Sequence, residues 1–280
     1  MRNNHIRISV KPRINRMDVV SPCCWYKMHE PGATSIVDAL GNGPAFAISG
    51  SGTLDSVGRL APAASNTTVR GTTAANDLLF SMLSLVPPIG QLIIALDFQH
   101  GGTVGQLATF FSTGVANSGA TAGGCLSIGC NTSEQAILQV RSGGLNTQIT
   151  ATGDTSIANA VRNALVWDIK GGADGVSLDV AVHRVGMVGS TVTSSFNIRT
   201  DDGNGKAPYG AGSNLGHTIG ANQSSVGGYN QHISGSVIDT HTLQNLLIMR
   251  RPTYESGLAL LIGEAMAQYP NEFPACLTGK

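Results

Sequence analysis

The chain has 280 residues and a formal net charge of zero, with 41% hydrophobic residues, 36 glycines and only 12% charged residues. This composition favours one large domain of many short strands, because surface helices use more glutamate, lysine and arginine. No apolar run reaches the roughly 18 residues of a membrane helix, so we expect no membrane partner. The five cysteines have neither a CxxC pair nor zinc-finger spacing, so we expect neither a disulfide framework nor a zinc site.

The N-terminal residues 1–40 show no clear period and contain Pro12, Pro22 and Pro31, which interrupt helices. The positive charges of the first sixteen residues are Arg2, Arg7, Lys11, Arg13 and Arg16. The rest of the chain holds 12 of the 17 basic residues and all 17 acidic ones, a net charge of −5. We therefore expect an extended arm that anchors on an acidic protein neighbour and stays outside the core. The acidic body and the lack of aromatic residues interleaved with these positive charges argue against nucleic acid.

The following segment, 41–280, has the pattern of a single β domain. Short apolar runs alternate with clusters of glycine, serine, asparagine and threonine, which is typical of strands and turns. The predicted strands span residues 78–86, 92–99, 107–112, 136–141, 163–170, 176–184, 232–238 and 246–250.

Two of these segments alternate most clearly between apolar and other residues. The apolar positions are Leu165, Trp167 and Ile169 in the first segment and Val176, Leu178, Val180 and Val182 in the second. Such a period of two predicts strands with one face in the core. The link 170–175, Lys-Gly-Gly-Ala-Asp-Gly, suits the positive backbone angles of a tight turn, so we expect an antiparallel hairpin.

Near the C-terminus, residues 253–269 are expected to form the one helix. The apolar positions at helical spacing are Leu258, Leu261, Ile262, Ala265 and Tyr269. Thr253 can cap this helix, Glu255 lies in its first turn, and Pro270 ends it. We expect its apolar stripe to pack on the sandwich edge or on a neighbouring protein.

The order of these segments resembles the concanavalin-like lectin and glucanase superfamily, in particular laminin-G-like and pentraxin-like jelly rolls. The resemblance covers residues 45–270 and rests on the pattern of the segments 78–86, 163–184, 215–221, 234–240 and 246–251, followed by the terminal helix. It implies an all-β fold, an antiparallel jelly-roll β-sandwich with an extended N-terminal arm and one C-terminal helix.

Such a module, with a basic arm and no secretion signal, looks like a structural protein of tailed bacteriophages. The main hypothesis is therefore a non-enzymatic protein of the virion, synthesised in the host cytoplasm, either a capsid decoration or a tail-associated protein. Its partners would be other virion proteins and copies of itself. The alternative hypothesis is a carbohydrate-binding adhesin or a glycan-active protein that uses the concave face of the sandwich and binds a host-surface glycan.

Catalytic motifs are missing from the sequence. It contains no Glu-x-Asp-x-Glu run, which would place two carboxylates on one face of a strand. It also lacks Gly-x-Ser-x-Gly, GxGxxG and GxxxxGK[ST]. Asp179 is the one acid that alternates with apolar residues of a core strand, and we expect it to face solvent. The sequence predicts neither an enzyme nor a cofactor.

Two loops hold the candidate ligand-binding residues. Tyr209 and Tyr229 lie in glycine-rich segments and could contact a glycan, although anchoring of the loops is the favoured interpretation. Asp201, Asp202 and Asn204 form an acidic, glycine-rich stretch whose oxygens could bind calcium. Their spacing does not match an EF-hand, so an ordinary turn is favoured over a metal site.

Overall fold

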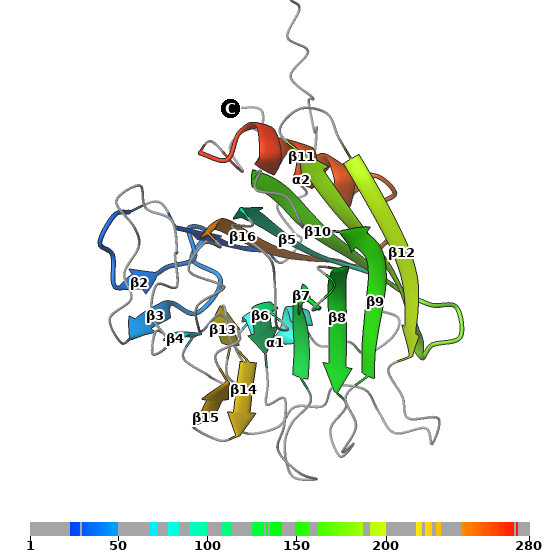
Figure 1. Cartoon of the computed structure of the whole chain (residues 1–280), viewed down its shortest axis with the longest axis horizontal. Coiled ribbons are helices and arrows are strands. Elements are labelled where there is room, and N and C mark those ends of the chain that lie inside the picture. Colours follow the sequence, from blue (N-terminus) through cyan, green and yellow to red (C-terminus); the bar gives the residue numbers. More distant parts are fainter. Residues whose placement is uncertain are drawn as a thin grey trace, which may run out of the picture.

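The computed structural model of the chain is shown in Figure 1. The structure describes residues 23–28, 30–49, 68–71, 78–83, 90–99, 108–113, 125–131, 133, 135–141, 149–156, 162–186, 191–199, 217–219, 222–225, 228–230, 242–271 and 273. Among these residues, no helix is both long and apolar enough to cross a membrane.

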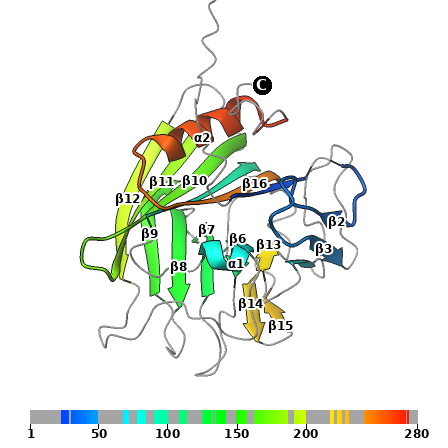
Figure 2. The ribbon, with the colours of Figure 1, turned by 180° about the vertical axis from the view of Figure 1, so that it is seen from behind.

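Two antiparallel sheets dominate the described part of the chain and face each other (Figures 1 and 2). The first has the order β1 (Cys23–Lys27), β16 (Thr242–Arg251), β5 (Gln91–Gln99), β10 (Arg162–Gly171), β11 (Ser177–Gly186) and β12 (Thr191–Arg199). The second has the order β2 (Ser35–Ile36), β3 (Phe46–Ser49), β4 (Thr68–Gly71), β13 (His217–Ile219), β6 (Ala108–Thr113), β7 (Cys125–Cys130), β8 (Gln135–Arg141) and β9 (Ile149–Ser156). A short hairpin joins β14 (Asn222–Ser225) and β15 (Gly228–Asn230). The predicted all-β, antiparallel jelly-roll sandwich is confirmed.

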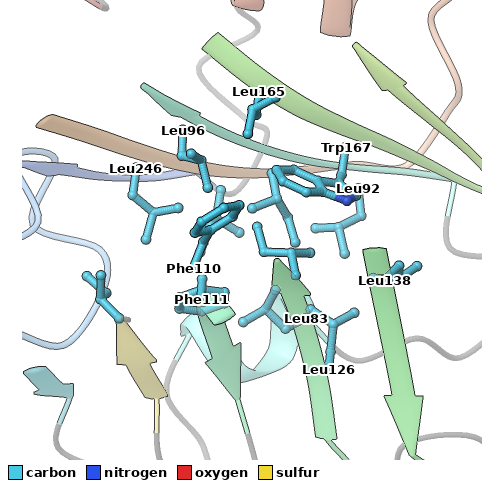
Figure 3. Packing of buried hydrophobic residues seen from close by; sticks show 14 of the residues in the cluster. Leu83, Leu92, Leu96, Phe110, Phe111, Leu126, Leu138, Leu165, Trp167 and Leu246 are labelled. Carbon is cyan, nitrogen blue, oxygen red and sulfur yellow. The ribbon is translucent and has the colours of Figure 1, made fainter. Parts of the chain in front are cut away.

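The main core fills the space between the two sheets (Figure 3). Trp167 on β10 is fully buried, and its ring meets that of Phe110 on β6 edge to face, with 6.5 Å between centroids. Leu165 and Ile169 share the face of Trp167, and Leu178, Val180 and Val182 of β11 join the same core. The core positions predicted from alternation in these two strands are therefore confirmed except for Val176, which is half-buried because it belongs to the turn before β11.

The predicted hairpin between β10 and β11 is also present. The two strands pair antiparallel from Asn163 opposite Gly186 to Gly171 opposite Leu178. In the turn, Gly175 has a φ of +73°, which glycine adopts without steric cost. The carboxylate of Asp174 accepts the backbone N–H groups of Val176 and Ser177 and closes the turn.

Helix α1 (Leu78–Leu83) lies where a strand was predicted for residues 78–86. Its Leu79, Met82 and Leu83 are spaced three and four residues apart, and all three are buried in the main core. A short apolar run is compatible with a strand or a buried helix, because periodicity alone does not separate them. The predicted strand is wrong over residues 78–83, and so is the prediction of one helix in the chain.

Helix α2 (Leu258–Gln268) starts later than predicted. Gly257 precedes it with a left-handed φ of 82°, so Thr253 does not cap it and Glu255 is not in its first turn. The helix ends before Pro270, as expected. Its apolar side does not pack on an edge or a neighbour but covers the outer face of the first sheet (Figures 1 and 2). That face needs a cover because the outward residues Ile93, Val166 and Leu247 are apolar.

The N-terminal strand β1 corrects the predicted extent of the arm. It pairs antiparallel with β16, from Cys23 opposite Met249 to Lys27 opposite Asn245. Cys24, Tyr26, Met28 and Ile36 are buried in the main core, so residues 23–28 and 30–40 belong to the sandwich, not to an external arm. Alternation is hard to see in such a short segment, and it becomes a strand because β16 offers an edge for pairing. The charged residues Arg2, Arg7, Lys11, Arg13 and Arg16 lie outside the described residues.

Three cysteines of the described residues are buried in the two apolar clusters. Cys23, Cys24 and Cys130 are free and buried. Burial raises the pKa of the Cys23 thiol to about 12, with the charge of Asp38 as a second cause. A thiol of such high pKa is protonated at neutral pH and behaves as a small apolar side chain.

Candidate functional site

An open pocket of about 390 Å³ lies on the outer face of the first sheet, over β10, β11 and β12. Trp167 and Ile169 point into the core, so Asp168 and Lys170 between them project to the opposite face. The loop between β16 and α2 contributes Tyr254 as a side wall. The polar side chains that line the pocket are those of Asp168, Lys170, Asp179, Ser195, Asn197 and Tyr254.

The register of the three strands places these side chains in two rows. Asp168, Ala181 and Ser195 lie opposite one another across β10, β11 and β12. Lys170, Asp179 and Asn197 form the next row, two residues along each strand. Because the sheet is packed on its other face against the main core, both rows stand on a rigid base.

Asp168 is the most buried polar group of the pocket, with 4% of its surface exposed. Its Oδ1 accepts a hydrogen bond from Nε2 of Gln91 at 2.8 Å, and its Oδ2 accepts one from the Tyr254 hydroxyl at 3.2 Å. Burial raises the pKa of the Asp168 carboxyl above its usual value, and the hydrogen bonds from Gln91 and Tyr254 offset part of this effect. The group is thus held in one orientation by two side chains.

Gln91 positions the loop that carries Tyr254. The fully buried Gln91 side chain donates from Nε2 to the carbonyl of Glu255 at 3.2 Å, and its Oε1 accepts the backbone N–H of Glu255 at 3.1 Å. Glu255 also forms an ion pair with Arg251 at 2.8 Å. These contacts tie the backbone of Glu255 to β5, and the left-handed Gly257 follows before α2 begins at Leu258.

Tyr254 presents an aromatic ring to the pocket, and 43% of its surface is exposed. Nζ of Lys170 lies 5.1 Å from the centroid of this ring, a distance typical of a cation–π contact. Desolvation and the neighbouring Asp168 raise the pKa of the Tyr254 phenol. The hydroxyl is therefore protonated at neutral pH and donates to Asp168.

The outer part of the site is polar and accessible. Nδ2 of Asn197 donates to Oδ1 of the exposed Asp179 at 2.9 Å, so the prediction that Asp179 faces solvent is correct. In the adjacent row, Nδ1 of His183 lies 2.9 Å from Oγ1 of Thr193. Burial lowers the pKa of His183, while the Asp168 charge partly opposes this shift. The pocket thus combines carboxylate acceptors, an amide and one exposed aromatic ring, which suits a small polar molecule with an apolar face.

The described residues that line this pocket include none of the residues proposed from sequence. Tyr209, Asp201, Asp202 and Asn204 lie outside the described residues, so the suggested calcium and glycan contacts there stay predictions. The backbone of Tyr229 lies in β15, opposite Gln223. In the part of the chain that the structure describes, no group of three or more His, Cys, Asp or Glu side chains could hold a metal ion.

Sequence reasoning missed Asp168 and Tyr254, although a signal for Asp168 exists. Asp168 is the one acid on the outward side of β10, where it follows the apolar Ala164 and Val166 and precedes Lys170. A charge at such a position needs partners, which marks it for attention. Tyr254 was assigned to a helix, so its role as a pocket wall was hidden by the wrong helix start.

Comparisons with known proteins found neither a matching family model nor a matching curated protein. Solved structures do match. The binding domain of botulinum neurotoxin DC in complex with SialylT has a TM-score of 0.51 at 10% identity, over 88% of this chain and 51% of that one. The structure of HCR/D-Sa-GBL1/C has a TM-score of 0.54 at 10% identity, over 89% of this chain and 52% of that one. The CBM40 domain of the Ruminococcus gnavus IT-sialidase has a TM-score of 0.38 at 10% identity, over 64% of this chain and 90% of that one.

The chain has a β-sandwich fold. It spans about half the length of the first two structures, and at 10% identity the likeness concerns the fold alone. None of the three structures connects the chain with a bacteriophage virion.

Proposed function

We propose that this chain is a carbohydrate-binding protein that holds its glycan in the pocket of Asp168 and Tyr254. The observation that carries the proposal is the exposed Tyr254 ring next to the buried Asp168 carboxylate, on a rigid sheet. A sugar ring has an apolar C–H face that packs on an aromatic side chain, and its hydroxyls donate to carboxylates in charge-assisted hydrogen bonds. The pocket offers both kinds of contact, the carboxylate from β10 and the aromatic ring from the loop between β16 and α2.

The comparison of folds agrees with this proposal but does not carry it. The botulinum neurotoxin DC domain of similar fold was solved in complex with SialylT. Because one sandwich fold serves many functions, the assignment rests on the pocket. Of the two hypotheses from sequence, the glycan-binding alternative is preferred, at a place different from the one expected. It was assigned to the concave face, whereas this pocket lies on the sheet face that carries α2.

The virion hypothesis is a separate proposal. It rests on the composition and on the basic arm, and the arm residues from Arg2 to Arg16 lie outside the described residues. Finding the chain in purified particles by electron microscopy would support it. Its absence from every particle made by the producing cell would contradict it. A glycan-binding protein can also be part of a virion, so neither result decides between glycan binding and its absence.

The test of glycan binding is a glycan array with the purified chain, followed by titration of the best ligand. We expect Tyr254→Ala to weaken binding at least about tenfold, because it removes the stacking surface and one partner of Asp168. Tyr254→Phe keeps the ring and should weaken glycan binding less than Tyr254→Ala does. Leu40→Ala is the control, an exposed apolar residue near β1, which forms the edge of the first sheet opposite β12. An array without any bound glycan, or binding that Tyr254→Ala leaves unchanged, would contradict the proposal.

A further inference from the structure

The pocket carries more negative than positive charge. Two of its lining side chains are carboxylates, Asp168 and Asp179, and one is an ammonium group, Lys170. Carboxylates accept hydrogen bonds and donate none. The pocket therefore favours ligands that bring donors and disfavours ligands that bring another anion.

The single ammonium group of the pocket, that of Lys170, has an aromatic ring and a carboxylate as neighbours. Nζ of Lys170 lies over the Tyr254 ring, and Lys170 is the cross-strand neighbour of Asp179 on the same face. The nearby Arg251 is paired with Glu255. Among the described residues at the pocket, each cation thus has an anionic or aromatic neighbour, and an acidic ligand would have to replace one of these contacts.

Asp168 makes the strongest contribution to this preference. It is almost fully buried at the pocket, and interactions between charges are stronger in such a poorly solvated place than in water. An acidic group placed next to it would be repelled, whereas a hydroxyl could share its lone pairs with the N–H of Gln91 and the hydroxyl of Tyr254. Asp179 and Asn197 extend the same acceptor surface outward.

We infer that the pocket selects uncharged, hydroxyl-rich sugars and rejects acidic ones that carry a carboxylate. This inference rests on the proposed glycan-binding function and names the ligand class of that site. Selectivity here comes from repulsion of the wrong ligand as much as from contacts to the right one.

The test uses matched neutral and acidic probes. Methyl glucoside and methyl galactoside are compared with methyl glucuronide and methyl galacturonide, which differ in having a carboxylate at C6. Array glycans are compared with their sialylated counterparts. We expect each neutral ligand that binds to exceed its acidic counterpart at least about tenfold, since like charges at an interface are strongly disfavoured. Raising the salt from about 0.1 to 1 M should narrow this ratio, because the Debye length falls from about 10 Å to about 3 Å.

Charge variants provide the control. Asp179→Asn removes one negative charge with little change in shape and should narrow the ratio of neutral to acidic binding severalfold. Glu30→Gln makes the same charge change at an exposed residue before β2 and should leave the ratio as it is. An acidic sugar that binds as well as its neutral counterpart, with Tyr254→Ala abolishing both, would overturn the inference but keep glycan binding. Absence of binding by every sugar would instead contradict the proposed function.

Discussion

Trp167 and Asp168 are neighbours in the chain, yet they serve opposite sides of β10. The pleat of the strand sends the indole into the core between the sheets and the carboxylate into the pocket. The rigidity of the site and the stability of the fold thus depend on adjacent residues, and they can be tested separately.

Replacement of Trp167 tests the core. Trp167→Ala is expected to reduce the free energy of unfolding by about 3–5 kcal/mol, because a fully buried aromatic residue leaves a cavity. Trp167→Phe should cost less, since the indole N–H has no hydrogen-bond partner among the described residues and none is lost. Urea unfolding followed by circular dichroism measures both. An alanine variant as stable as the wild type would show that β10 has a different register.

The pH dependence of stability tests the burial of Asp168. Its folded pKa lies above the ordinary 3.8, so the folded state holds this proton more tightly than the unfolded chain. The contribution of Asp168 to the free energy of unfolding should therefore decrease as the pH rises from 3.8 through the folded pKa. The Asp168→Asn variant lacks this loss, so its stability relative to the parent chain should increase as the pH rises above 3.8.

A His183→Gln background isolates that effect. The lowered pKa of His183 has the opposite effect on stability. The unfolded chain binds a proton at this histidine more readily than the folded chain, so the free energy of unfolding rises as the pH increases towards 6.5. Thermal unfolding of the single and double variants across this pH range is the measurement. A difference in stability between the parent chain and the Asp168→Asn variant that stays constant with pH would mean that the carboxyl is not perturbed.

At the scale of elements, α2 approaches the first sheet at Gly263. A Cβ at this position would lie 2.9 Å from Cγ2 of Val166 and 3.0 Å from Cγ2 of Val185. Gly263→Leu should therefore destabilise by about 1–3 kcal/mol through overpacking. Gly263→Ala combines a smaller clash with a helix-propensity gain of roughly 0.5–1 kcal/mol. In a Val166→Ala background the clash with Val166 is removed, so Gly263→Ala should gain more stability than it does in the parent chain. If the effects of the two substitutions on the free energy of unfolding are additive, the close contact is contradicted.

Strand β1 is expected to be indispensable. Tyr26 meets Phe46 edge to face at 4.7 Å between centroids, and the carboxylate of Asp38 accepts the backbone N–H of Trp25 at 2.7 Å. Removing residues 1–28 deletes three buried core side chains, worth about 1.5–3 kcal/mol each. Their sum approaches the total stability of a typical domain, about 5–15 kcal/mol. We therefore expect this truncated chain not to fold, whereas removal of residues 1–20 keeps β1 and should preserve cooperative unfolding.

For the whole molecule, we predict binding without hydrolysis. Both oxygens of Asp168 accept hydrogen bonds from the protein, and the pocket is open to water. Asp179, the other carboxylate of the pocket, is exposed, so the environment does not prepare it as a partner in acid–base catalysis. Incubation with glycans that bind on the array should release no reducing sugar. Release that Asp168→Asn abolishes would show that the pair is catalytic.

The sequence alone determined the fold class and the core of the β10–β11 hairpin. Alternation along residues 163–184 specifies which side chains are buried, and the Asp-Gly turn specifies the antiparallel pairing, because both depend on short-range geometry. The predicted strands 92–99, 107–112, 136–141 and 246–250 correspond to β5, β6, β8 and β16, since short apolar runs between turn residues favour strands. The predicted strand 232–238 lies outside the described residues. Helix α1 was not predicted, because a six-residue apolar run has too little periodicity to distinguish a helix from a strand.

The site itself was decided by tertiary structure. Asp168 and Tyr254 are 86 residues apart, and Gln91 contacts the backbone of Glu255 across 164 residues. Such contacts depend on sheet order, which places β5 beside both β10 and β16, and local patterns do not encode that order. The path of the chain before α2 has the same origin, since the buried Gln91 side chain holds the backbone of Glu255. Long-range hydrogen bonding to a buried side chain thus places the loop that carries Tyr254 and shapes the pocket.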